Sequence, residues 1–163
     1  MEGKKQHESS AADAPSGLGL RVLPRVRLVR TPAEPHPYRE PVRQAIDIYR
    51  LLGGDVSAWD REHFIALLLD SRSRIIGLDE VAVGTLTAAL VHPRELFKAA
   101  ILANAHALVL VHNHPSGDPE PSSEDVALTK RLVEAGEILG IKIMDHVVIG
   151  DGRYRSFSEE GRL

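Results

Sequence analysis

The 163-residue sequence contains no cysteine, which excludes disulfide bonds and thiolate metal sites. Histidine and carboxylate side chains remain as its strong metal ligands, and eight histidines are present. No run of about 18 consecutive apolar residues occurs, and no apolar stretch follows the first lysines. We therefore expect neither membrane insertion nor export. The expected location is cytoplasmic, with which the absence of cysteine is compatible.

The sequence also lacks an excess of positive charge. Twenty lysines and arginines stand against 23 aspartates and glutamates, for a formal net charge of -3. No positive field covers the whole molecule to attract phosphate backbones, so any nucleic-acid contact has to be local. Aromatic residues are scarce at 4%, whereas hydrophobic residues make up 43%. This balance is typical of a soluble globular protein with an aliphatic core, and the length fits one domain plus a tail.

We expect residues 1–37 to be a flexible tail ahead of one globular domain over residues 38–163. Residues 1–19 are polar and contain proline and glycine, so they bury too little apolar surface to offset the entropy of ordering. Residues 20–30 alternate aliphatic residues with arginine, which predicts a possible edge strand with one solvated face. Its four arginines are an alternative phosphate contact: Arg21, Arg25, Arg27 and Arg30.

Helical and strand patterns alternate through the expected domain. Apolar residues at helical spacing predict three helices, over 39–51, 92–104 and 123–139, with Gly53 and Gly54 closing the first. Short apolar runs predict five strands, over 64–70, 75–83, 107–111, 141–149 and 154–157. The first two strands form a hairpin, and the third is a central strand buried on both faces. Strands that alternate with helices imply an α/β sandwich around one sheet.

Two histidines follow the predicted central strand. Because side chains alternate across a strand, His112 and His114 project from the same face, as a bidentate metal site requires. The loop that begins at Pro115 brings the next helix back over the end of the strand, with Asp125 in its first turn. Two imidazole nitrogens and one carboxylate oxygen, with a fourth position left for water, are the arrangement of a catalytic zinc site. Such a metal lowers the pKa of water and polarises a carbonyl.

These residues also have structural interpretations. Paired histidines beside a turn are often surface or capping residues, and Ser122 with Asp125 forms a capping box. Ser122 is in addition placed to donate to a developing oxyanion, and the two roles are compatible. His146, in the strand predicted over 141–149, is either a hydrogen-bonded core histidine or a contact to the metal ligands or the substrate. Asn113 and Ser116 flank the histidine pair and either orient the ligands or line a groove.

The segment from His112 to Asp125, HNHPSGDPEPSSED, resembles the His-x-His, seven residues, Ser, two residues, Asp signature of JAMM (MPN-plus) metalloproteases. The form is that of the bacterial RadC family, and the resemblance covers about residues 40–163. Further segments are similar to RadC in the same order, at 84–86, 92–95, 145–150 and 154–157. The resemblance implies a JAMM-like (cytidine-deaminase-like) α/β sandwich. Its mixed, mainly antiparallel sheet is flanked by helices, and the metal lies at the sheet edge against the third helix.

The resemblance also implies a glutamate on an early strand as general base towards the attacking water. Glu62 is the best match because it opens the first core strand, and Glu95 and Glu80 are its rivals. The implied function is zinc-dependent hydrolysis of a peptide or isopeptide bond in a peptide or protein substrate. Its catalytic residues are Glu62 and Ser122.

Two other functions stay open at this point. One is a DNA-repair-associated protein that binds nucleic acid locally, for which Arg25 and Arg27 are the candidate contacts. RadC proteins usually carry a DNA-binding helix-hairpin-helix segment ahead of this domain, and none is recognisable in the sequence. The other is a metal-binding interaction module without turnover. The sequence does not indicate an oligomeric state.

Overall fold

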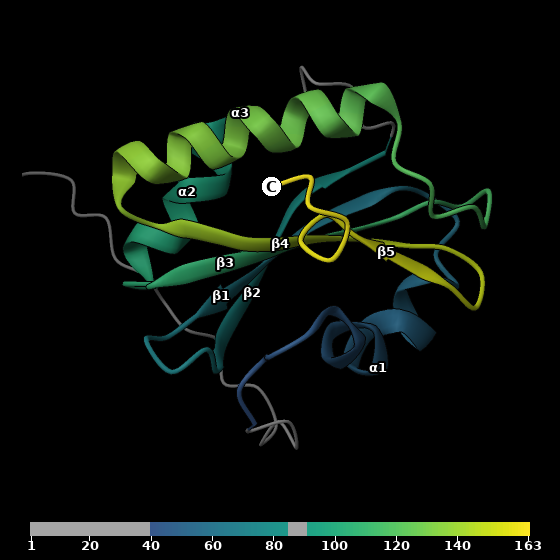
Figure 1. Ribbon diagram of the computed structural model, residues 1–163, viewed down its shortest axis with the longest axis horizontal. Coiled ribbons are helices and arrows are strands. Elements are labelled where there is room, and N and C mark those ends of the chain that lie inside the picture. Colours follow the sequence, from purple (N-terminus) through teal and green to yellow (C-terminus); the bar gives the residue numbers. More distant parts are fainter. Residues whose placement is uncertain (1–39, 85–90) are drawn as a thin grey trace, which may run out of the picture. The chain divides into compact units, whose positions relative to one another are not determined.

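The computed structural model describes residues 40–84 and 91–163 (Figure 1). Its centre is a five-stranded sheet with the strand order β2-β1-β3-β4-β5. The strands are β1 (His63–Leu69), β2 (Ile75–Val83), β3 (Ala107–Asn113), β4 (Lys142–Ile149) and β5 (Tyr154–Ser156). The helices are α1 (Ala45–Val56), α2 (Pro93–Leu102) and α3 (Ser123–Leu139). Only the β3–β4 pair of this sheet is parallel, which confirms the α/β fold with a mixed, mainly antiparallel sheet.

Several expectations fall on residues that the structure does not describe. The tail over 1–37, the edge strand over 20–30 and its arginines lie outside the described residues. The same holds for the domain boundary at residue 38, so these remain predictions. Among the helices of the described segments, none is long and apolar enough to cross a membrane.

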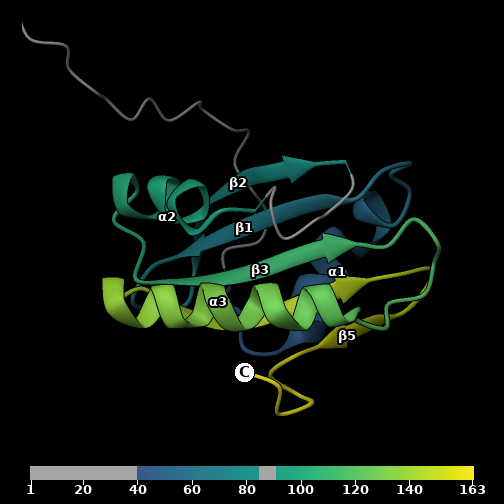
Figure 2. The same cartoon turned by 90° about the horizontal axis from the view of Figure 1, so that it is seen from above.

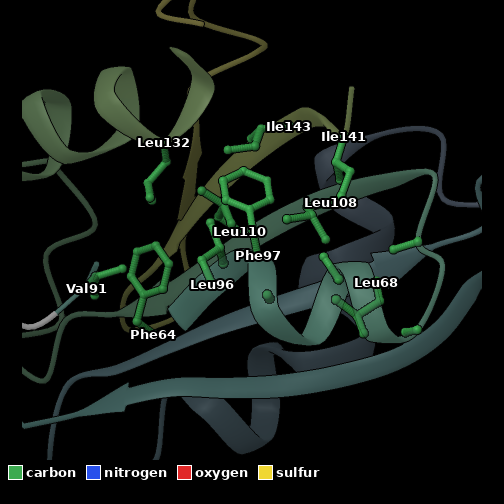
Figure 3. Packing of buried hydrophobic residues seen from close by; sticks show 14 of the residues in the cluster. Phe64, Leu68, Val91, Leu96, Phe97, Leu108, Leu110, Leu132, Ile141 and Ile143 are labelled. Atoms are coloured by element: carbon green, nitrogen blue, oxygen red, sulfur yellow. The ribbon is translucent and has the colours of Figure 1, made fainter. Parts of the chain in front are cut away.

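Helices cover both faces of the sheet (Figures 1 and 2). Helices α2 and α3 lie on one face, and the apolar cluster beneath them includes Phe64 and Leu110 (Figure 3). Helix α1 covers the opposite face, over a second cluster that includes Ile65 and Val111. Because both faces are buried, β1 and β3 are almost continuously apolar, as expected for central strands. A strand residue therefore faces α3 or α1 according to its place in the alternation.

Helix α3 connects β3 to its parallel neighbour β4. The helix runs back along the sheet, so that its first turn lies near the end of β3 (Figure 2). It ends at Gly140, whose φ of 69° is left-handed and favours glycine. The close approach of α3 to Ile141, the residue before β4, also depends on Gly136. A Cβ at Gly136 would lie only 2.6 Å from the Ile141 carbonyl oxygen.

The first helix differs from its predicted span of 39–51. It begins only after a capping box formed by Gln44 and Asp47, and it continues through both glycines to Val56. The prediction that Gly53 and Gly54 close this helix was wrong. Burial of Val56, which is 1% exposed, favours the last turn and opposes the roughly 1 kcal/mol that each of the two glycines costs inside a helix. The other elements begin and end within about two residues of their predicted spans.

Candidate metal centre

Three polar side chains converge where β3 ends and α3 begins. The Nε2 atoms of His112 and His114 are 2.9 Å apart. Oxygens of the Asp125 carboxylate lie 3.4 Å from His112 Nε2 and 3.5 Å from His114 Nε2. One candidate ligand atom from each residue lies within 4.8 Å of the others. The structure thus brings the three predicted ligands together. They lie at the end of the central strand β3 and not on an edge strand of the sheet.

The loop from residue 115 to residue 121 is held against the end of β4. The His114 backbone N–H donates to the Ile149 carbonyl oxygen at 2.9 Å. Gly150 comes next, and a Cβ there would contact Pro119 Cδ at 2.8 Å and also collide with the Gly117 carbonyl. The loop therefore fits only against a glycine, and this packing carries the chain from β3 to the start of α3.

Asp125 takes part in a capping box while its carboxylate faces both imidazoles. Its Oδ2 accepts from the backbone N–H of Ser122 at 2.8 Å and from the Ser122 hydroxyl at 2.6 Å. The Ser122 oxygen accepts in turn from the Asp125 N–H at 3.1 Å. The predicted capping box is therefore present, and it orients the carboxylate rather than competing with a ligand role. Because the Ser122 hydroxyl hydrogen already points at Asp125, donation to an oxyanion requires the hydroxyl to rotate.

The contacts of the two Nδ1 atoms determine which nitrogen of each imidazole carries the hydrogen. His114 Nδ1 lies 2.7 Å from the Asp118 carbonyl oxygen, which can only accept, so Nδ1 is the donor. His112 Nδ1 lies 2.8 Å from His146 Nε2, and a hydrogen on His112 Nδ1 completes that contact. In the neutral rings both Nε2 atoms then carry lone pairs that face each other.

This donor set fits a divalent cation. Two facing lone pairs repel unless a positive charge lies between them, and a carboxylate beside them adds negative charge. Atoms bound to one tetrahedral zinc ion at about 2.0 Å lie about 3.3 Å apart. The observed separations of 2.9, 3.4 and 3.5 Å lie on either side of that value. The two imidazoles and the carboxylate are thus arranged as a metal site requires.

Burial and the neighbouring charges act differently on the three groups. Burial lowers the pKa of His112, which has no exposed surface. The Asp125 carboxylate raises the pKa of the partly buried His114, because a protonated His114 ring can donate a hydrogen bond to it. Burial acts to raise the pKa of Asp125, but the two imidazoles, which donate to its carboxylate when they are protonated, hold it well below its ordinary value. Asp125 is therefore ionised at neutral pH, so that the site presents a negative charge to a cation.

Glu62 lies directly before β1 and beside this cluster. Its charge acts to raise the pKa of both His112 and His114. Phe64 pairs with His112 in the antiparallel β1–β3 ladder, and continuing this register sets Glu62 opposite His114. Glu62, which is partly buried, thus has a register position on the face of the sheet that carries the histidines.

Asn113 holds the backbone on both sides of Glu62. The side-chain oxygen of Asn113 accepts from the His63 N–H at 2.8 Å, and its nitrogen donates to the Arg61 carbonyl at 2.8 Å. Of the alternatives left open for Asn113, the structure supports an orienting one, although the segment that it orients carries Glu62 rather than the ligands. Ser116 instead lines a shallow cleft with Glu62, and the other lining residues are Asp60, Arg61, Gly84 and Pro115.

The two rival glutamates have other partners. Glu80 pairs with Ile65 across the β1–β2 ladder and so lies on the α1 face. Its carboxylate contacts His63 Nδ1 at 3.0 Å. Glu95 lies in the first turn of α2, where its hydrogen bond with Lys98 lowers its pKa. Their surroundings favour structural roles for both residues.

The structure places His146 in contact with the candidate ligand His112, with His146 Nε2 2.8 Å from His112 Nδ1. His146 has no exposed surface, and burial lowers its pKa well below the ordinary value. Its second nitrogen lies 2.6 Å from Thr129 Oγ1. Thr129 was not among the candidate residues predicted from the sequence. The available signal was its position four residues after Asp125, which puts both side chains on one face of α3.

The fold and the cluster define a hydrolase-like module whose site fits a metal cofactor. Residues 42–162 match the family described as the RadC-like JAB domain. The chain therefore belongs to the RadC-like JAB domain family, as its motifs indicated.

Relatives are similar over most of this chain. A UPF0758 protein of Desulforamulus reducens is 49% identical over 137 residues, covering 84% of this chain and 59% of that protein. UPF0758 proteins of Methanococcoides burtonii and Caldanaerobacter subterraneus are 50% and 53% identical, over 75% and 71% of this chain. The chain spans 53% and 49% of the length of those two relatives. The name UPF0758 states no activity.

Proposed function

We propose that this chain is a zinc-dependent metallopeptidase that hydrolyses a peptide or isopeptide bond. The observation that carries the proposal is the convergence of two imidazole Nε2 atoms and one ionised carboxylate at the end of β3. A second carboxylate, Glu62, lies close enough for its charge to act on both imidazoles. A metal-ligand set with a neighbouring acid–base group is the composition that metal-assisted hydrolysis requires.

Each residue has a stated role in the proposed reaction. His112, His114 and Asp125 hold the metal, and Ser122 orients the Asp125 carboxylate through its hydroxyl and N–H. When bound, zinc supplies a Lewis acid that polarises the scissile carbonyl and makes water more acidic. Glu62 takes a proton from the attacking water as its oxygen bonds to the carbonyl carbon.

The same carboxylate completes the reaction. Glu62 returns its proton to the nitrogen as the carbon–nitrogen bond breaks, so that an amine and a carboxylic acid leave, and the acid then releases its proton to solvent. Before this bond breaks, a rotated Ser122 hydroxyl donates to the oxyanion. The substrate enters through the shallow cleft that Glu62, Gly84 and Ser116 line. A peptide or protein substrate is part of the proposal, since the names of the relatives specify none.

The first test is metal content. We expect wild-type protein to bind one zinc ion per chain, and we expect His114→Ala to bind none at the same free zinc concentration. His106→Ala is the control, because His106 lies in the described domain outside the cluster. Equal zinc uptake by His114→Ala and wild type, or no divalent cation in the wild type, contradicts the proposal.

The second test separates metal binding from turnover. Wild type and Glu62→Gln are compared on a peptide library and on an isopeptide-linked probe. We expect Glu62→Gln to retain zinc and lose about 10²–10⁴-fold in cleavage rate, the usual contribution of a general base. Glu80→Gln is the matched control on the neighbouring strand, and it should cleave at the wild-type rate.

Two results would change the assignment. Normal cleavage by Glu62→Gln shows that another group is the base. A full zinc complement in wild-type protein with no cleavage of any peptide or isopeptide probe favours an interaction module without turnover.

A further inference from the structure

Three buried groups connect α3 to the metal ligands by way of β4. Thr129 Oγ1 lies 2.6 Å from His146 Nδ1, and His146 Nε2 lies 2.8 Å from His112 Nδ1. None of the three residues is more than 1% exposed. The remaining nitrogen of His112 faces His114 and Asp125. A continuous line of polar contacts therefore runs from the core of α3 to the metal-facing nitrogen.

The hydrogens in this line have one consistent arrangement. The Thr129 hydroxyl donates to the Asp125 backbone carbonyl at 2.7 Å, because a carbonyl can only accept. The Thr129 oxygen then accepts from His146 Nδ1–H. His146 Nε2 is left with a lone pair, which accepts from His112 Nδ1–H. His112 Nε2 is thereby left with a lone pair too, and this is the form that binds a metal.

We propose that Thr129 and His146 are positioning residues that fix His112 in its metal-binding tautomer. The hydrogen-bonded line Thr129–His146–His112 is hereafter called the relay. The inference rests on the metal centre of the proposed function, because the relay matters only if His112 binds a metal. Neither Thr129 nor His146 touches the metal position, so both act through His112. Hydrogen bonds of this kind to the far nitrogen of a ligand histidine orient the ring and determine its tautomer.

The relay opposes a competing effect of Asp125. The Asp125 carboxylate lies 3.4 Å from His112 Nε2, and a carboxylate attracts a hydrogen to that nitrogen. A hydrogen on Nε2 would block metal binding by His112. His146 offers an acceptor at the shorter distance of 2.8 Å on the other side of the ring. Removal of this acceptor leaves Asp125 as the stronger attraction for the single ring hydrogen.

Thr129→Val tests the relay because valine has nearly the shape of threonine but no hydroxyl. Without the hydroxyl oxygen, His146 Nδ1 loses its acceptor and His146 is free to carry its hydrogen on Nε2. That hydrogen faces His112 and forces the His112 hydrogen onto Nε2. Thr129→Ser is the matched control, since serine keeps the hydroxyl and loses only a methyl group. Thermal unfolding of both variants checks that the domain is folded.

The first readout is ¹⁵N NMR of the imidazole nitrogens in chelator-treated protein. We expect the His112 hydrogen on Nδ1 in wild type and Thr129→Ser, and on Nε2 in Thr129→Val. The second readout is zinc affinity, measured by competition with a chromophoric chelator. We expect Thr129→Val to bind zinc about 10–100-fold more weakly than wild type, the usual effect of losing such a hydrogen bond. Thr129→Ser should bind as wild type does.

A second pair of variants tests the middle of the relay. In His146→Gln the side-chain oxygen accepts from His112 Nδ1–H, so zinc affinity should stay close to that of wild type. In His146→Leu no acceptor remains, and the loss should be at least as large as in Thr129→Val. Equal zinc affinities for all four variants and wild type would overturn the relay.

The NMR readout requires neither metal nor turnover. A His112 hydrogen found on Nε2 in the wild type would overturn the relay whatever the enzyme does. A wild type that takes up no zinc would instead overturn the proposed function. The two failures are therefore distinguishable.

Discussion

The Asn113 side chain on β3 hydrogen-bonds to the backbone on both sides of Glu62, so the strand that carries two candidate metal ligands also positions the proposed base. Alternation along β3 makes this possible. His112 faces α3 and the cluster, whereas Asn113, the next residue, faces the start of β1. One strand end thus sets the distance between the ligands and the base.

The amide of Asn113 predicts a kinetic effect without a loss of metal. We expect Asn113→Ala to bind zinc as wild type does and to lose about 10-fold or more in kcat, because a misplaced base costs rate steeply. Asn113→Asp keeps the acceptor for the His63 N–H and should lose less. The measurement is zinc stoichiometry alongside steady-state cleavage. A parallel loss of zinc and activity would show that Asn113 supports the ligands instead.

Metal binding should stabilise the fold. In the proposed function zinc binds the native cluster, whose candidate ligands come from β3 and α3, and the unfolded chain does not hold them together. At 100 times the dissociation constant the gain in unfolding free energy is about 2.7 kcal/mol. We expect the thermal unfolding midpoint of wild-type protein to rise when zinc is added and to return when a chelator is added. In His114→Ala, zinc should leave the midpoint unchanged, and an equal rise there would point to binding elsewhere.

The two roles of Asp125 can be separated by comparing two substitutions. Ser122→Ala removes the N-cap hydroxyl of α3 and should cost about 1 kcal/mol of unfolding free energy. It leaves the ligand charge in place, so zinc binding should weaken only modestly. Asp125→Asn still accepts from the Ser122 N–H but lacks the charge, and we expect it to abolish zinc binding at a smaller cost in metal-free stability. Denaturant unfolding in chelator, with zinc titration, distinguishes the two, and identical profiles would contradict this division.

Much of the site could be predicted because its signals are local. His112 and His114 are two residues apart at the end of an apolar run, and Asp125 lies three residues after its capping serine. Each relationship holds within a single strand or a single helix turn, where periodicity determines direction. The parallel β3–β4 connection brings these two elements together, and the sequence indicated their approach through the loop that begins at Pro115.

The residues that the sequence did not identify act through tertiary contacts. The role of Thr129 depends on His146, 17 residues away on another element, and no local spacing connects them. Asn113 contacts Arg61 across 52 residues, so its side chain could be placed beside the ligands but not beside Glu62. The predicted end of α1 was wrong for a related reason. Glycine marks helix ends by propensity, and the burial of Val56 overrides that propensity.

Gly150 predicts a coupled loss of stability and metal binding. A Cβ at this position would meet Pro119 and the Gly117 carbonyl, and neither can move without shifting the loop that leads to α3. We expect Gly150→Ala to cost about 1–3 kcal/mol, as overpacking does, and to weaken zinc binding because Asp125 moves with the loop. Gly54→Ala, where no atom lies within 4 Å of the added Cβ and the backbone is helical, is the control for alanine itself. It should leave zinc affinity unchanged.

Asp70 predicts a pH dependence far from the metal. Its carboxylate accepts from the backbone N–H groups of Arg72 and Arg74 and from the Arg74 guanidinium. Hydrogen bonds with Arg74 lower the pKa of Asp70 from 3.8 to about 2. Because the folded pKa is below the unfolded one, the contribution to stability is complete above about pH 4 and is lost as the pH falls through 2.

Asp70→Asn should therefore be less stable than wild type at pH 7. The gap in unfolding free energy should narrow between pH 4 and pH 2, where wild-type Asp70 takes up its proton. Urea denaturation of chelator-treated protein measures the gap without interference from metal loss. A difference in unfolding free energy between Asp70→Asn and wild type that stays constant from pH 7 to pH 2 would contradict this prediction. It would mean that the Asp70 charge does not stabilise the β1–β2 turn, because the hydrogen bonds of Asp70 would be equally strong with a protonated side chain.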